Sequence, residues 1–77
     1  MTRKSFERTL RVFSRRAPFR PYLLEFVSGD RIQVRHPEAV EPFGDLLLYR
    51  TPNRENRIFE AEAVVQFIDP APTQQPT

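Results

Sequence analysis

The sequence contains no cysteine, only two glycines and a single histidine. Without cysteine the chain has no disulfide, no reactive thiol and no zinc–thiolate site. Small secreted domains usually depend on disulfides because their cores are thin, so this composition favours a reducing compartment, and we expect a cytoplasmic protein. Gly29 and Gly44 are too few for a glycine-rich phosphate-binding loop, and the P-loop and dinucleotide-binding patterns are absent.

Long apolar runs are also absent, since no stretch approaches the roughly 20 apolar residues of a membrane-spanning helix. The cationic start of the chain is not followed by the apolar segment of a secretory signal. Residues 1–20 are rich in arginine and poor in acid, which is also typical of a transit peptide. We prefer an integral helix for this segment, because its apolar residues have helical spacing.

The length of 77 residues predicts one compact domain, which we assign to residues 1–69. Hydrophobic residues make up 39% of the chain and charged residues 29%, as in a globular domain. Folding a chain of this size buries only about 60–65% of its unfolded surface, so we expect a thin core. Residues 70–77 contain three prolines and two glutamines, and we expect a disordered tail there.

Charge is distributed unevenly along the chain. Residues 1–20 contain seven of the twelve Lys and Arg residues against one acid, Glu7, for a net charge of +6. Residues 21–77 contain five arginines and nine acids, for a net charge of −4. A basic segment on an acidic body indicates either an anionic partner for the segment or an attraction between the two parts.

Apolar residues at steps of four, three and four predict a helix over residues 5–16, with Phe6, Leu10, Phe13 and Ala17 on one face. Ser5 is a suitable N-cap, Glu7 is placed in the first turn, and Pro18 ends the helix. Four cations follow the same steps on the opposite face: Lys4, Arg8, Arg11 and Arg15.

From Tyr22 onward the apolar pattern alternates with a period of two, which predicts strands at about 22–27, 31–36, 46–50, 57–60 and 64–68. We expect a helical turn at 37–40, a turn at 42–45 and a tight turn at 61–63. A three-residue loop at 28–30 would set Phe26 opposite Ile32 and Leu24 opposite Val34.

The predicted fold class is mainly β with one N-terminal helix, that is, α+β. Four or five short strands in about fifty residues need closure or a cover to protect their edges. A small SH3-like or Sm-like barrel, with the helix packed across one opening, meets this need. The alternative is an open or strongly bent antiparallel sheet packed on the helix.

Residues 18–22 read Pro-Phe-Arg-Pro-Tyr, residues 29–31 Gly-Asp-Arg and residues 34–38 Val-Arg-His-Pro-Glu. This pattern resembles a group of small uncharacterised bacterial proteins, which have a Pro-Phe-x-Pro-aromatic start, an acidic-Gly turn and a strand ending in His-Pro-Glu. The turn here reads Ser-Gly-Asp instead. The resemblance implies a compact fold and no assigned activity.

Residues 43–48 and 60–68 resemble the two motifs of the Sm/Hfq-like barrels, which have an N-terminal helix followed by five strands. That resemblance implies a shared topology and leaves an oligomeric ring open. The Asn of the first motif and the Arg-Gly of the second, which form the family's uridine pocket, are absent here. The pocket is therefore not carried over to this chain.

Catalytic candidates are few. His36 has Glu38 nearby in sequence, but a metal site would need further ligands and catalysis a positioned nucleophile. Glu60 and Glu62 would share a face in a strand, and we expect them on a solvated edge. The nine aromatic residues could include base-stacking platforms, but more often such residues build a core. We predict no catalytic residue, no metal site and no cofactor.

The four cations Lys4, Arg8, Arg11 and Arg15 are the candidate site, because an Arg-rich helical face suits phosphate oxygens. We expect a non-enzymatic binding module for nucleic acid or another polyanion. Several alternatives stay open: an ordinary solvated helix face, an acidic protein or an anionic membrane surface as partner, and a protein-interaction or self-assembly module with no nucleic-acid role, including a homo-oligomer.

Overall fold

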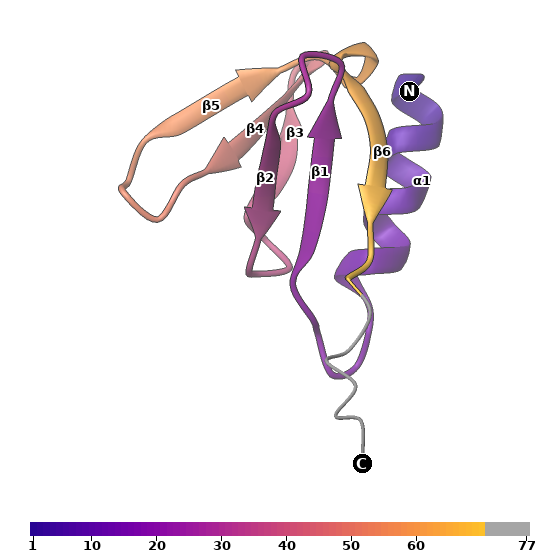
Figure 1. The fold of residues 1–77 in the computed structure, drawn as a ribbon, viewed down its shortest axis with the longest axis vertical. Helices are drawn as coiled ribbons and strands as arrows, with labels where there is room; N and C mark the ends of the chain where they lie inside the picture. Colours follow the sequence, from indigo (N-terminus) through magenta and orange to yellow (C-terminus); the bar gives the residue numbers. More distant parts are fainter. Residues whose placement is uncertain (71–77) are drawn as a thin grey trace.

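The computed structural model describes residues 1–70 and contains one α-helix, one short 3-10 helix and six strands (Figure 1). The order along the chain is α1 (Arg3–Ser14), β1 (Tyr22–Phe26), β2 (Arg31–Val34), β3 (Val40–Phe43), β4 (Leu46–Arg50), β5 (Asn56–Phe59), η1 (Ala61–Ala63) and β6 (Val64–Ile68). The tail predicted for residues 70–77 lies outside the described residues, except for Pro70.

The strands form two three-stranded antiparallel sheets, in the orders β2-β1-β6 and β3-β4-β5. The α+β class with an N-terminal helix is confirmed. Within residues 1–70 no hydrogen-bonded ladder joins the two sheets into a closed barrel. Residues 35–39 connect them instead, between β2 and β3.

The helix occupies residues 3–14 and not the predicted 5–16. Thr2 is the N-cap, and its hydroxyl accepts a hydrogen bond from the Ser5 backbone N–H at 3.1 Å. Both are good capping residues, and although Ser is the slightly better one, the structure uses Thr2. With this start Glu7 lies beyond the first turn, and Arg15 becomes the C-cap.

A sixth strand, β3, takes residues 42–43 of the turn predicted at 42–45 and the last residue of the helical turn predicted at 37–40, so that the turn itself is formed by Gly44 and Asp45. We did not predict a strand here because Pro42 has no N–H to donate to the hydrogen bonds of a sheet. The structure resolves the conflict by placing β3 at the edge of its sheet, where a strand needs only one set of backbone partners. The strand β2 correspondingly ends at Val34, two residues earlier than predicted.

The register of the first hairpin differs from the prediction by two residues. Leu24 lies opposite Ile32 and Tyr22 opposite Val34, because the three-residue loop is 27–29 rather than 28–30, with Phe26 opposite Asp30. The Phe26 N–H donates to the Asp30 carbonyl at 2.9 Å and closes this loop, in which Gly29 has a φ of +95°. A shift of two keeps every side chain on its predicted face.

Aromatic contacts join the helix to both sheets. The Phe6 ring lies 5.1 Å from the Phe67 ring on β6 and 6.0 Å from the Phe59 ring on β5. Phe59 also meets Phe26 of β1 edge-on at 5.2 Å. Phe6 is fully buried. Eight of the nine aromatic residues belong to this core or pack against it, and the exception is Phe43, which is 52% exposed.

Tyr22 is the largest fully buried side chain and stacks on Phe67 with the ring centroids 5.5 Å apart. Its hydroxyl has no hydrogen-bond partner within residues 1–70. The Ser14 hydroxyl lies close enough to moderate its titration but does not meet hydrogen-bond geometry. Burial raises the pKa of Tyr22 to about 12, from an ordinary value of 10.0.

Replacing the central aromatic anchor should unfold much of the population. We expect Phe6→Ala to lower the free energy of unfolding by about 3–5 kcal/mol. Domains of this size have a total of roughly 4–12 kcal/mol. Urea unfolding followed by circular dichroism measures the change. Val12→Ala, at a 61% exposed position of the same helix, is the control and should stay within about 0.5 kcal/mol of the parent. Equal effects of the two variants would contradict the assigned packing.

The buried phenol should make the protein sensitive to alkali. Between pH 10 and 12 the unfolded chain loses the Tyr22 proton while the folded chain keeps it, so stability falls as pH rises. Tyr22→Phe should be neutral or stabilising at pH 7, because it removes an unpaired buried hydroxyl. The variant should also lose on the order of 2–3 kcal/mol less than the parent between pH 9 and 12. If the free energy of unfolding fell by the same amount with pH in the parent and in Tyr22→Phe, the prediction would be refuted.

Candidate nucleic-acid interface

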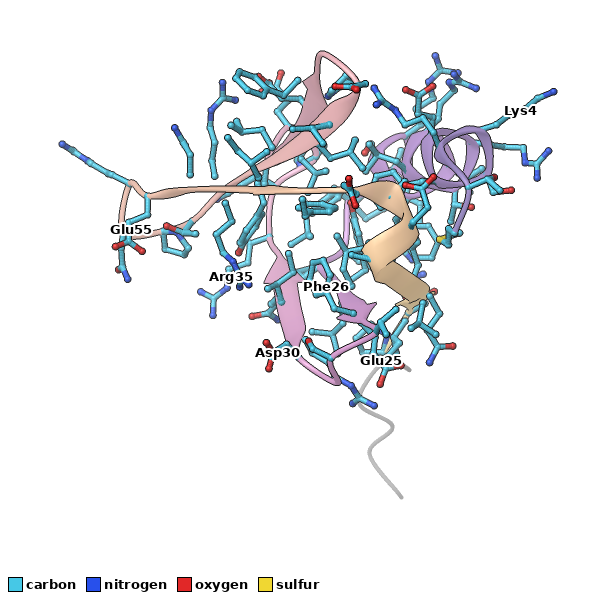
Figure 2. The ribbon with its side chains drawn as sticks, turned by 90° about the horizontal axis from the view of Figure 1, so that it is seen from above. Lys4, Glu25, Phe26, Asp30, Arg35 and Glu55 are labelled. Carbon is cyan, nitrogen blue, oxygen red and sulfur yellow. The ribbon has the colours of Figure 1, made fainter. Side chains whose placement is uncertain are left out.

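The helix α1 has one face buried in the core and an opposite face exposed to solvent. Phe6 is fully buried and Leu10 is 8% exposed, so the apolar face is buried in the core and is not available to a ligand. At 100° per residue, Lys4, Arg8, Arg11 and Arg15 lie on the opposite side of the helix, and all four are exposed. We call these four residues the basic stripe. Figure 2 shows Lys4 projecting away from the sheets.

The side chains of the basic stripe make no ion pair and no hydrogen bond with any residue of the described range 1–70. The other three N-terminal cations are engaged internally. Arg3 pairs with Glu7 at 2.6 Å and donates to the Gly44 carbonyl at 3.1 Å. The structure therefore divides the seven cations of residues 1–20 into four free ones and three with structural contacts.

Arg16 and Arg20 meet at one carboxylate, that of Asp69, which follows β6. The distances are 2.8 Å from Arg16 and 3.5 Å from Arg20. Arg16 also donates to the Arg20 carbonyl at 2.8 Å and lies 4.7 Å above the Phe13 ring. The hydrogen bond from Arg16 holds the pKa of Asp69 below its usual value. These contacts tie the end of the helix to the end of β6.

Carboxylates of the body also pair locally and leave the basic stripe free. Glu25 accepts hydrogen bonds from Gln66 at 2.6 Å and Arg31 at 3.5 Å, and the Gln66 bond is the main cause of its lowered pKa. Glu41 accepts a two-point contact from Arg50, at 2.9 and 3.0 Å. The attraction between the basic segment and the acidic body thus runs through Asp69, which pairs with Arg16 and Arg20, and does not involve the stripe.

His36 lines a cavity of about 440 Å³, together with Glu38. Sequence reasoning did not detect this cavity, because its walls come from the ends of β2 and β4 and the segments beside them. The two hydroxyl groups that line the cavity already form hydrogen bonds: Tyr49 donates to the Gln33 carbonyl, and Thr51 bonds to the Glu55 backbone. Within residues 1–70 no side chain donates a hydrogen bond to the imidazole or accepts one from it, so no nucleophile–base pair forms there.

The pair Glu60 and Glu62 does not share a strand face. Glu60 precedes η1 and Glu62 lies within it, and both are exposed. Residues 1–70 hold no group of three His, Cys, Asp or Glu side chains arranged to bind a metal ion. None of their helices combines the length and apolar character that crossing a membrane requires.

Comparison of the chain with protein-family models, with curated proteins and with solved structures found no significant match.

Proposed function

We propose that this protein is a non-enzymatic binding module that binds nucleic acid through the basic stripe. One observation carries the proposal: four cations are exposed, and have no ion pair within residues 1–70, along one face of a helix whose opposite face is anchored in the core. Anchoring matters because a ligand then meets a preformed row of charges, and little ordering entropy opposes binding.

The dimensions of the stripe suit a phosphate backbone. From Lys4 to Arg15 the helix rises about 16 Å, at about 1.5 Å per residue. Duplex DNA carries about one charge per 1.7 Å, so roughly ten phosphate charges lie within that length. Three of the four residues are arginines, whose forked guanidinium groups can contact two phosphate oxygens at once.

A membrane surface is the less favoured polyanion. Helices that bind in a lipid interface insert their apolar face among the acyl chains. Here Phe6 and Leu10 are already buried in the core, and Val12 is the one large apolar side chain of α1 that is strongly exposed. The helix can therefore offer charge to a surface but has almost no apolar area to insert.

The relationship to SH3-like or Sm-like barrels and the cytoplasmic location belong to the same proposal. The connectivity supports the first, since β1 pairs with both β2 and β6, and the short helix η1 precedes the last strand. The absence of cysteine supports the second. Neither is needed for the binding mode, which depends on α1 alone.

Binding should depend steeply on salt and on the position of the arginines. For four phosphate contacts, affinity for a labelled 20-base-pair DNA should fall about 100-fold between 50 and 200 mM salt. Replacing Arg8, Arg11 and Arg15 with Gln leaves one stripe cation, so the same change in salt should cost only about three- to fourfold. Fluorescence anisotropy measures both, with RNA of the same length and anionic vesicles as parallel ligands.

The matched control replaces three exposed arginines of the body, Arg31, Arg35 and Arg54, with Gln. It changes the net charge by the same amount and should keep most of the salt dependence. Similar losses in both triple variants would mean that total charge and not the stripe drives binding. No nucleic-acid binding by the parent at 50 mM salt, or stronger binding to vesicles than to nucleic acid, would refute the proposal.

Releasing the two tethered arginines should strengthen binding. In Asp69→Asn the shared carboxylate is lost, so Arg16 and Arg20 become available beside the stripe. Each added phosphate contact should steepen the slope of log K against log salt by about 0.9 on duplex DNA. Glu41→Gln frees Arg50 on the other sheet with the same change in net charge, and serves as control. Equal gains for both variants would contradict this assignment.

A further inference from the structure

Two separate three-stranded sheets leave four edge strands: β2 and β6 in one sheet, β3 and β5 in the other. An open edge presents unpaired N–H and C=O groups that invite another strand, and proteins usually blunt such edges.

Three of the four edges carry a recognisable block. On β2, the Tyr49 hydroxyl donates to the Gln33 carbonyl at 2.8 Å. On β6, the Met1 nitrogen donates to the Val64 carbonyl at 2.6 Å, and α1 lies alongside (Figure 1). On β3, Pro42 has no N–H to offer.

The fourth edge, β5, has no such block. Its ladder is with β4, and within residues 1–70 no backbone hydrogen bond joins Asn56–Phe59 to another element. Figure 1 shows β5 at the margin of the molecule, with β4 on one side and no strand on the other. Ile58 is 49% exposed, a large apolar side chain on an unpaired edge.

We propose that β5 pairs with β5 of a second copy of this chain, antiparallel and about a two-fold axis, so that the two β3-β4-β5 sheets become one six-stranded sheet. A second copy is the favoured occupant because the edge is self-complementary in one register. The proposal is independent of nucleic-acid binding, since the basic stripe lies on α1.

Two symmetric registers keep most of this four-residue strand paired, one centred on Arg57 and one on Ile58. The first sets Arg57 directly opposite its own copy, and like charges opposite one another destabilise a sheet. The second sets Ile58 against Ile58 on the outer face. On the inner face it sets Arg57 against Phe59 of the second copy, a cation–aromatic pair. Charge and apolar contact therefore select the register centred on Ile58.

The inner-face contact extends one already present. Arg57 lies 5.9 Å from the Phe26 ring, and Phe59 packs on Phe6 and Phe26 from the same face. A cavity of about 190 Å³ lies beside these residues, with Val27 and Ile58 among its lining. Only residues 57–59 of each copy are paired in this register, which buries much less than the 1,200–2,000 Å² or so of a standard interface, so the dimer should be weak and concentration-dependent.

The absence of native cysteine allows a direct test by single-cysteine crosslinking. In the proposed register the two Ile58 Cα atoms lie about 4.5–5.5 Å apart, within disulfide range. Ile58→Cys should form a covalent dimer under mild oxidation at least tenfold faster than Val65→Cys, a 52% exposed valine on the blocked β6 edge. Equal rates for the two variants, or no crosslinking of Ile58→Cys, would overturn the proposal.

Arg57→Cys tests the register. Its two copies would be about 7–8 Å apart on the diagonal, too far for a disulfide without backbone movement. Faster crosslinking of this variant than of Ile58→Cys would overturn the assigned register.

Sedimentation equilibrium measures the association of the protein without crosslinking. The parent should show a monomer–dimer equilibrium that Ile58→Lys abolishes and Val65→Lys leaves intact, with circular dichroism verifying that both variants fold. A parent that stays monomeric at millimolar concentration, or an equal effect of both lysines, would refute the pairing. Substitutions in the basic stripe should leave the dimer unchanged, so this outcome is separate from that of the binding experiment.

Discussion

The burial of Phe6 between Phe59 and Phe67 is the interaction on which the rest of the structure depends. It connects α1 to a strand of each sheet, although the two sheets share no ladder. It also fixes the rotation of the helix about its axis, because a fully buried ring leaves no freedom to turn. Since the helix cannot turn, the residues opposite Phe6 must face water, and the exposure of the basic stripe follows from core packing.

Ion pairing then separates cations that the sequence presents as one cluster. Arg16 and Arg20 converge on Asp69, where their charge stabilises the junction between the helix and β6. The Asp69 carboxylate is 43% exposed, and ion pairs that reach the surface contribute little to stability, so we assign the effect of these two pairs mainly to geometry. What remains is a row of four cations that form no ion pair within the described part of the chain, which is a stronger basis for binding phosphate than the net charge of residues 1–20.

The open architecture of the two sheets has its own consequence. A closed barrel would have removed the edges of the sheets. In this chain three of the four edges are blocked separately: β2 by a tyrosine hydroxyl, β6 by an amino nitrogen and β3 by a proline. The edge left without such a device, β5, also carries the exposed Ile58. The proposed assembly through β5 and the proposed binding through α1 involve different elements, so the two proposals are compatible in one molecule.

The amino-acid sequence alone determined the α+β class, the helix face that bears the stripe and the inward face of each strand of the first hairpin. It also excluded disulfides and thiol chemistry, because the chain has no cysteine. The inward faces follow from apolar residues that recur every three to four residues in the helix and every two in the strands, and such a period is visible without tertiary contacts. The register of that hairpin was beyond reach, since a slip of two preserves the pattern. So was β3, because Pro42 is acceptable only at an edge, and edges exist only once the sheets are assembled. Tertiary structure alone decided which cations stay free, because the partner of Arg16 lies more than fifty residues away at Asp69 and charge pairs at that separation have no local signature.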